Sequence, residues 1–259
     1  MLKKTNMSNI KLTALSTTIV QSDHAVITGD GFVNSTVPGW TNCEVNVIIN
    51  EAMGANFCQL LITLQQEGKL KGKTDKTQIF FYVLEGSCNI ELDGEKTTLH
   101  KGSYAYVPIE KEYIFNNAEE GTKLLTFHKT YEHLEGYDIP KPIINSEEDI
   151  NQNIYCNDPD LLMQNLLPDQ DNLSFDMAVN IFTYNPGANL PFVETHIMEH
   201  GLLYLQGQGI YRLADKWYPI KKGEAIWMAP YCPQWFGALG KEPAVYIYYK
   251  NVNRFPIIP

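Results

Sequence analysis

The sequence contains few cysteines, and none is placed as a metal-binding or redox pair would require. Its 259 residues include five cysteines, an odd number, and no two of them have the CxxC spacing. They are widely scattered, at Cys43, Cys58, Cys88, Cys156 and Cys232. This distribution argues against a disulfide framework and against a cysteine-based zinc site, and it favours reduced thiols in a cytoplasmic protein.

Long apolar runs and long basic runs are also absent. No stretch approaches the ~18 consecutive apolar residues of a membrane-spanning helix. The N-terminal residues 1–20 have a basic start, but Asn, Ser, Lys and Thr interrupt the apolar part that a signal peptide needs. The formal net charge is -10 without a Lys/Arg cluster, so we expect neither a membrane nor a nucleic acid as partner.

The chain is instead rich in residues that favour β-strands. It has 15 Tyr and 11 Phe, and hydrophobic residues make up 44% of the sequence. Short alternating apolar segments are separated by Gly and Asp turns, which is typical of antiparallel sheets, and no long amphipathic helix is indicated. The pattern predicts an all-β globular protein that is long enough to bury a substantial core.

Two segments of the chain are similar and indicate an internal repeat. They read LEGSCNIELDGEKTTLHKGSYAYVPIEKEYIF and LQGQGIYRLADKWYPIKKGEAIWMAPYCPQWF. Gly86 and Gly207 stand 121 residues apart, and so do Gly102 and Gly223. One offset shared by two glycines, with matching apolar positions between them, predicts a tandem duplication of a β-barrel unit.

The repeat divides the chain into four expected segments. Residues 1–50 form an N-terminal segment that adds edge strands, and 51–131 form the N-terminal barrel. Residues 132–172, which are acidic and contain prolines, form the inter-barrel linker. The C-terminal barrel comprises 173–259.

The second unit contains a compact set of potential metal ligands. Glu194 and His196 are two residues apart, so on a strand their side chains share one face. His200 stands at the start of the next apolar strand and can return to that face. One carboxylate and two imidazoles form a metal site by ligand type. From these three residues alone, a polar strand end at the mouth of a barrel is the alternative.

The wider spacing resembles that of the cupin family, small jelly-roll β-barrels that hold a metal. In that family two His and a Glu of a first motif bind the ion, together with a His that ends a second motif. Glu194, His196 and His200 match the first three positions, and Gly207 closes that motif. Gln234 stands where the last His is expected. The resemblance therefore implies a metal bound by a permuted set, Glu194, His196, His200 and Gln234, in a tandem cupin, or bicupin.

The first unit differs at the corresponding positions. A shift of 121 residues maps the four ligands onto Lys73, Asp75, Ile79 and Tyr113, of which only Asp75 is a potential ligand. We therefore expect one ion per chain, in the C-terminal barrel, and a structural role for the N-terminal barrel.

The ligand chemistry narrows the choice of ion. Two imidazoles, a carboxylate and an amide oxygen, without a thiolate, suit Mn(II) or Fe(II), with Zn(II) and Ni(II) as alternatives. Four protein ligands leave two positions of an octahedral ion for water or substrate, which suits catalysis.

The last strand carries a second polar face. Tyr246, Tyr248 and Lys250 alternate along it and share one side. If this side faces the barrel interior, a lysine and tyrosine hydroxyls stand near the metal as proton donors or anion anchors. An outward polar face fits the periodicity equally well.

The C-terminal half resembles one cupin family more narrowly. The run ETHIMEHGLLYLQGQGIYRLADKWYPIKKGEAIWMAPYCPQWFGALG, followed by YIYYKNVNR, is similar to the (S)-ureidoglycine aminohydrolase family of allantoin and purine degradation. That resemblance implies Mn(II), a homo-oligomer, and hydrolysis of ureidoglycine to ureidoglycolate and ammonia. It implies substrate contacts by Glu194, Gln234, Tyr246 and Lys250, with catalytic roles for Glu194, Tyr246 and Lys250. Tyr246 and Lys250 would then face the barrel interior.

Two other functions fit the same features. A cupin dioxygenase uses two His and a carboxylate on Fe(II), with open positions for oxygen and substrate. A non-catalytic cupin binds a sugar or another metabolite, and a shared fold does not by itself distinguish these functions. Dependence on oxygen would favour the dioxygenase.

Overall fold

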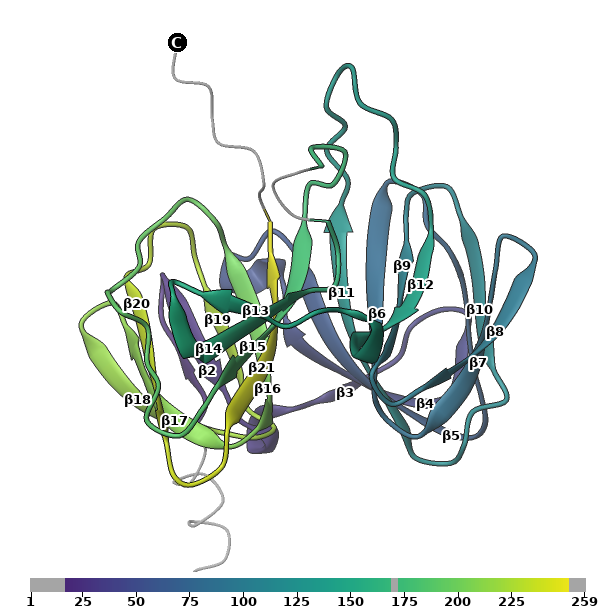
Figure 1. Cartoon of the computed structure of the whole chain (residues 1–259). Coiled ribbons are helices and arrows are strands. Elements are labelled where there is room, and N and C mark those ends of the chain that lie inside the picture. The colour runs from purple at the N-terminus through teal and green to yellow at the C-terminus, as the bar shows by residue number, and fades with distance from the viewer. Residues whose placement is uncertain (1–16, 169–171, 252–259) are drawn as a thin grey trace, which may run out of the picture.

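The computed structural model describes residues 17–168 and 172–251, which form two β-barrels side by side (Figure 1). Regular structure in this part of the chain is strand, apart from the 3-10 turns η1 (Gly29–Gly31), η2 (Glu51–Met53) and η3 (Glu147–Asp149). The predicted all-β class is confirmed. Within the same residues, no helix has the length and hydropathy needed to cross a membrane. Most of the N-terminal stretch judged unlike a signal peptide lies outside the described residues.

The first barrel is a strongly curved ten-stranded antiparallel sheet. The strand order is β12-β9-β6-β11-β5-β10-β7-β8, and β4 pairs with both β5 and β3. Its strands are β3 (Asn34–Ser35), β4 (Trp40–Ile49), β5 (Cys58–Lys73), β6 (Thr77–Glu85), β7 (Ser87–Leu92), β8 (Glu95–His100), β9 (Ser103–Val107), β10 (Glu112–Asn116), β11 (Thr122–Thr130) and β12 (Ile143–Ser146). The long strand β5 pairs with β11 along its first half and with β10 along its second half, so it links the two parts of the curved sheet.

The second barrel is built from two sheets. An eight-stranded sheet has the order β1-β2-β19-β16-β21-β15-β14-β13, and a three-stranded sheet has the order β18-β17-β20. Their strands are β1 (Ile19–Val20), β2 (His24–Ile27), β13 (Asn153–Tyr155), β14 (Asp158–Asn165), β15 (Ala178–Tyr184), β16 (His200–Gln206), β17 (Gln208–Leu213), β18 (Lys216–Lys221), β19 (Ala225–Met228), β20 (Gln234–Leu239) and β21 (Ala244–Lys250).

Segments that precede the second barrel in the sequence complete its larger sheet. Strands β1 and β2 extend the sheet beyond β19, and in Figure 1 β2 lies, in purple, within the green and yellow barrel. The hairpin β13–β14, from the segment predicted as a linker, extends the sheet beyond β15. Strand β12 of the same segment pairs with β9 of the first barrel. The predicted domain boundaries stay a prediction.

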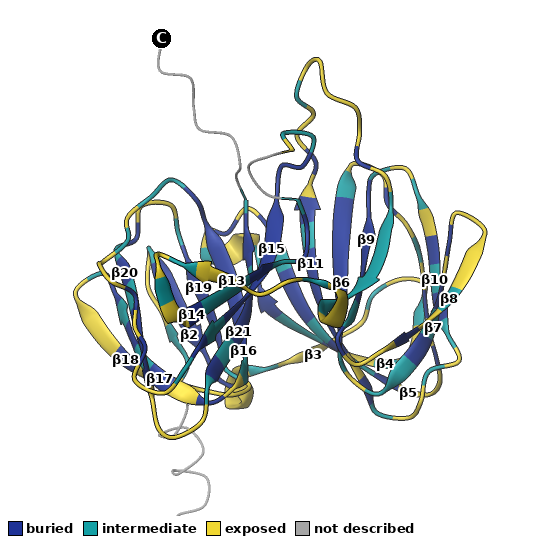
Figure 2. Ribbon diagram, in the orientation of Figure 1, coloured by how far each residue is buried: buried dark blue, intermediate teal, exposed yellow. Residues whose placement is uncertain are grey.

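Alternation along the strands produces three hydrophobic cores. Figure 2 shows that strands of both barrels contain long buried stretches. One core fills the first barrel, one lines the second, and the third lies between the barrels. In this third core the Tyr249 ring of β21 stacks on Phe57 with centroids 4.2 Å apart and on Phe127 of β11 at 5.7 Å. The barrels therefore pack through aromatic faces.

The repeat keeps its register in three dimensions. Gln234 pairs with Leu213 in the second barrel, and Tyr113 pairs with Leu92 in the first. Gln234 and Tyr113 are 121 residues apart in the sequence, and so are their pairing partners. Tyr113 and Ile79 belong to the apolar core of the first barrel and are 4% and 5% exposed. Apolar packing thus occupies two of the four corresponding positions, while Lys73 and Asp75 are exposed.

Candidate metal centre

The four predicted ligands come from a loop and two strands of the second barrel. Glu194 and His196 lie in the loop between β15 and β16, His200 begins β16, and Gln234 begins β20. Glu194 and Gln234 form an isolated β-bridge, in which each backbone N–H donates to the carbonyl of the other at 2.8 and 2.9 Å. This pair fixes the loop against β20. The His196 carbonyl accepts from the backbone N–H of Tyr231 at 2.7 Å, which anchors the loop again.

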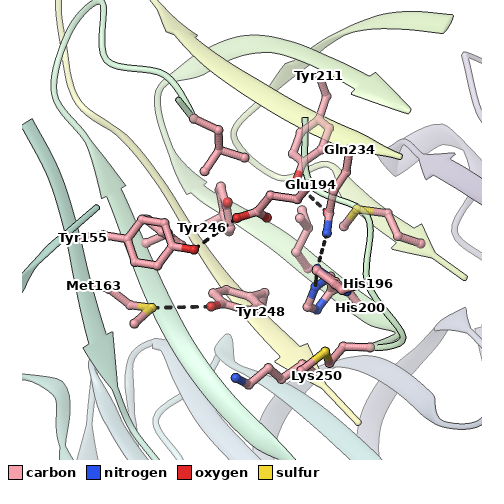
Figure 3. Close-up of a pocket in the computed structure, with 15 residues that line it drawn as sticks. Tyr155, Met163, Glu194, His196, His200, Tyr211, Gln234, Tyr246, Tyr248 and Lys250 are labelled. Atoms are coloured by element: carbon pink, nitrogen blue, oxygen red, sulfur yellow. Dashed lines mark hydrogen bonds between the residues drawn. The ribbon is translucent and has the colours of Figure 1, made fainter. Parts of the chain in front are cut away.

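Three of the four side chains converge (Figure 3). The Nε2 atoms of His196 and His200 are 3.2 Å apart, and the Gln234 Nε2 lies 2.8 Å from the His196 Nε2. Two adjacent ligands of one octahedral ion, with bonds of roughly 2.1 Å, are about 3 Å apart. The spacing of the two imidazoles therefore fits a shared ion.

The hydrogen bonds of these side chains leave electron pairs directed at one point. The His200 Nδ1 lies 3.2 Å from the Tyr249 carbonyl, which only accepts, so Nδ1 carries the proton and Nε2 keeps its lone pair. With the amide as placed, the Gln234 N–H lies 2.8 Å from the His196 Nε2 and can donate to its lone pair. A divalent cation at this point would replace that N–H as the partner of the lone pair. A half-turn of the Gln234 amide would present its oxygen to the same cation.

Burial keeps both imidazoles neutral, as metal ligation requires. Desolvation, followed by the neighbouring His196, lowers the pKa of His200 to about 3. Desolvation also lowers the pKa of His196. Neutral imidazoles at physiological pH are available to a divalent ion without competition from protons.

The carboxylate of Glu194 stands apart from the imidazole pair. Glu194, His196 and His200 do not all bring ligand atoms within 4.8 Å of one another. The Glu194 Oε1 instead accepts from the Tyr155 hydroxyl at 3.1 Å, as Figure 3 shows. Burial raises the pKa of Glu194, while the Tyr155 hydrogen bond and the charge of Lys250 oppose the rise. To join an ion held by the other three, Glu194 would present its second oxygen, Oε2, through a change in its side-chain torsions.

The polar face of β21 points into the same cavity. Tyr246, Tyr248 and Lys250 all line it, whereas Ile247 and Tyr249 belong to the core between the barrels. Lys250 is 9% exposed and pairs with His200 across the strands. Tyr246 is 4% exposed, and its hydroxyl shares a 3.0 Å hydrogen bond with Tyr184. Of the two orientations that periodicity allowed, the inward one is observed.

The cavity has a volume of about 230 Å³ and combines one cation, one carboxylate and an aromatic wall. Sequence reasoning missed several side chains that line it: Tyr155, Met163 and Tyr211. Tyr211 follows the alternation of β17, and its hydroxyl points to the Gln234 Oε1 at 3.5 Å. Tyr155 and Met163 had no signal in the sequence, because their hairpin lies in the predicted linker.

A second cluster of potential ligands lies outside this cavity. Asp23, His24 and Cys232 each place one ligand atom within 4.8 Å of the others. Both ring nitrogens of His24 already have partners, the Asp23 Oδ1 and the Tyr218 hydroxyl, each at 2.8 Å. Burial raises the pKa of the Cys232 thiol to about 11 and so keeps it protonated. This cluster is a hydrogen-bonded contact between β2 and the rest of the second barrel.

Comparison with known proteins gives consistent similarities. Residues 60–128 match the family model described as Cupin domain. A rice protein named probable (S)-ureidoglycine aminohydrolase is 36% identical, covering 95% of this chain and 79% of its own length. The (S)-ureidoglycine aminohydrolases of Arabidopsis thaliana and Escherichia coli are 34% and 32% identical, covering 95% and 91% of this chain and 81% and 91% of their own lengths.

Solved structures support the same fold. The crystal structure of protein Ylba from Escherichia coli has a TM-score of 0.83 and 30% identity, covering 94% of this chain and 97% of that one. A mutant of Bacillus subtilis oxalate decarboxylase has a TM-score of 0.67 at 12% identity, covering 90% and 81%, and is evidence of the fold alone. The predicted bicupin architecture is confirmed. The donor set and this fold together indicate a metal-binding protein.

Proposed function

Because this chain belongs to the (S)-ureidoglycine aminohydrolase family of cupin proteins, we propose that it hydrolyses (S)-ureidoglycine to (S)-ureidoglycolate and ammonia. The observation that carries the proposal is the cavity in which His196, His200 and Gln234 converge beside a carboxylate and a lysine. The names of the curated relatives favour this hydrolase over the dioxygenase and over passive metabolite binding.

The proposed reaction exchanges one substituent on a single carbon. The C–N bond to the α-amine breaks, a C–O bond to water forms, and the amine leaves as ammonia. The lone pair of the ureido nitrogen assists the departure of the amine. The reaction needs a proton for the leaving amine, an acceptor for the proton of water, and a fixed orientation of the substrate.

Glu194, His196, His200 and Gln234 would hold the ion, for which Mn(II) is our proposal. When bound, such an ion supplies a Lewis acid that lowers the pKa of water and orients the substrate. The neutral imidazoles and the amide oxygen suit a hard divalent cation without a thiolate ligand.

The remaining polar side chains suit binding and proton transfer. Lys250 is the cation of the cavity and would pair with the substrate carboxylate. Glu194, whose pKa burial raises, would take a proton from water and return one to the departing amine. Gln234 and Tyr246 would contact the substrate through amide and hydroxyl. A substrate fixed on one side of the water would account for a single stereoisomer of the product.

The decisive experiment uses purified protein, Mn(II) and freshly generated ureidoglycine, and follows ammonia release and product chirality. We expect release well above the spontaneous rate, formation of the (S)-product, and loss of activity after chelation. A rate equal to the spontaneous background would refute the proposal.

Three further predictions accompany this function. We expect a cytoplasmic location, a homo-oligomeric state and a place in purine and allantoin degradation. Support for a reducing location comes from the thiols, since all five cysteines are free.

A further inference from the structure

The hairpin β13–β14 contributes a tyrosine to the candidate metal centre. The Tyr155 side chain lines the cavity, and its hydroxyl donates to the Glu194 Oε1 at 3.1 Å (Figure 3). This hairpin precedes the second barrel in the sequence and joins it only as the outermost pair of strands of its larger sheet.

The position of this phenol is set by a ring contact and by the turn that follows it. The Tyr155 ring contacts Phe182 edge-on, with centroids 4.9 Å apart and an interplanar angle of 81°. The chain reverses directly after Tyr155 through Cys156 and Asn157, with φ of 52° and 58°. Two successive positive φ values are those of the tight turn that joins twisted strands. The hydroxyl is therefore presented by a fixed element of the sheet.

The hydrogen bond from Tyr155 restricts the side chain of Glu194. Its backbone is held by the two hydrogen bonds to Gln234, so only its side-chain torsions remain variable. A carboxylate has two oxygens, and Tyr155 binds one of them. The second oxygen stays available to an ion or to a proton in transfer. Partners of this kind orient metal ligands, and their loss typically weakens metal binding ~10- to 100-fold.

We propose that Tyr155 is a positioning residue of the metal centre, which holds the Glu194 carboxylate by one oxygen so that the other serves the ion. The inference rests on the proposed function, because it assumes that Glu194 is a ligand. It gives the predicted linker a direct part in the site.

The chain provides a matched control for the test. In the first barrel, the Tyr82 hydroxyl donates to the Glu147 Oε2 at 2.6 Å, also between a strand of the barrel and the segment that follows it. Tyr82→Phe thus removes the same type of hydrogen bond as Tyr155→Phe, at a place outside the cavity.

The experiment measures the dissociation constant of Mn(II) for metal-free wild type, Tyr155→Phe and Tyr82→Phe. The electron paramagnetic resonance signal of free Mn(II) reports the unbound ion. The rise in melting temperature on adding Mn(II) provides a second, independent readout. We expect Tyr155→Phe to raise the dissociation constant ~10- to 100-fold and to reduce the Mn(II)-induced rise, with Tyr82→Phe within about twofold of wild type.

The outcomes separate this inference from the function on which it rests. If wild type binds no Mn(II), the proposed metal centre itself fails. If wild type binds and Tyr155→Phe binds equally well, the metal centre stands and the role of Tyr155 is refuted. Equal weakening in both variants would also refute it, because a general loss of stability would then explain the effect.

Discussion

At the scale of single residues, burial decides the chemistry of this site. His200 is 7% exposed, and its Nδ1 faces a carbonyl. Its Nε2 is therefore unprotonated, and the lone pair of this atom is directed at a second imidazole. Burial raises the pKa of Glu194, because it favours the protonated, neutral form of the carboxyl group. Neutral nitrogen ligands beside a carboxyl group with a raised pKa suit metal-assisted hydrolysis.

Replacing the two charged side chains of the cavity should give different defects. We expect Lys250→Ala to lower the rate of ammonia release by ~100-fold or more while Mn(II) is retained, because a substrate anchor is lost but no ligand. Glu194→Ala should lose both activity and metal. Ammonia release and metal content per chain distinguish the two. Full activity of either variant would remove its assigned role.

The burial of His200 predicts how the metal-free protein responds to acid. Its pKa is about 3 when folded, below the ~6.5 of an unfolded chain, so the unfolded state binds the proton more readily. The resulting stability is fully present above pH ~6.5 and is lost as the pH falls toward 3. Melting temperatures of the metal-free protein between pH 7 and 4 should therefore fall less steeply for His200→Asn than for wild type. Parallel curves would contradict this.

At the scale of elements, the turn of the hairpin β13–β14 determines how the Tyr155 side chain enters the cavity. Its two turn residues both have positive φ, a conformation that Asn tolerates and Gly adopts freely. The shift in pairing register between Ile154 and Tyr155 is a second local irregularity of the hairpin. Together they set the direction of the Tyr155 ring.

Substitutions at Asn157 should test this turn. Asn157→Gly should leave the free energy of unfolding unchanged or raise it by up to ~1 kcal/mol, because glycine adopts the required φ without strain. Asn157→Val should lower it by ~1–3 kcal/mol, since a β-branched residue is strained at φ near 58°. Urea unfolding curves measure both. Equal stability of the two variants would show that the turn is not under this constraint.

At the scale of the whole molecule, buried contacts bind the barrels into one unit. β-strand β16 passes so close to Phe57 that a side chain at Gly201 would collide with its ring. The Glu199 carboxylate accepts from the backbone N–H of Asn56 at 3.1 Å and from the Trp227 indole at 2.9 Å. These contacts flank His200, so the first barrel supports the strand that carries a ligand.

A buried ion pair at the junction of the two halves should be sensitive to loss of one partner. The Lys129 Nζ lies 2.6 Å from the Asp176 Oδ2, and both side chains are 4% exposed. Asp176→Ala should lower the free energy of unfolding by ~3–5 kcal/mol, because the buried ammonium then keeps only the exposed Glu132 carboxylate, at 3.3 Å, as its counter-charge. The exposed pair Lys111–Asp93 provides the control, and Asp93→Ala should cost at most ~1 kcal/mol. Equal losses in denaturant unfolding would contradict the assignment.

The sequence by itself determined the class of the protein and its repeat. Alternating short strands, turn glycines and the shared offset of 121 residues are local or periodic signals, and they predicted the all-β bicupin that is observed. The ligand positions came from the resemblance to the cupin motifs, whose fixed spacing keeps its register within a barrel. His196, His200 and Gln234 do converge, while their function as metal ligands stays a prediction.

Only the tertiary structure decided which distant segments complete the second barrel. The pairing of β2 with β19 and of β14 with β15 depends on edges that become available once the sheets have formed, and no local pattern encodes it. Tyr155 therefore reaches Glu194 from 39 residues away in the sequence. The inward face of β21 was settled in the same way, since periodicity gives two faces and only packing against the other barrel selects one.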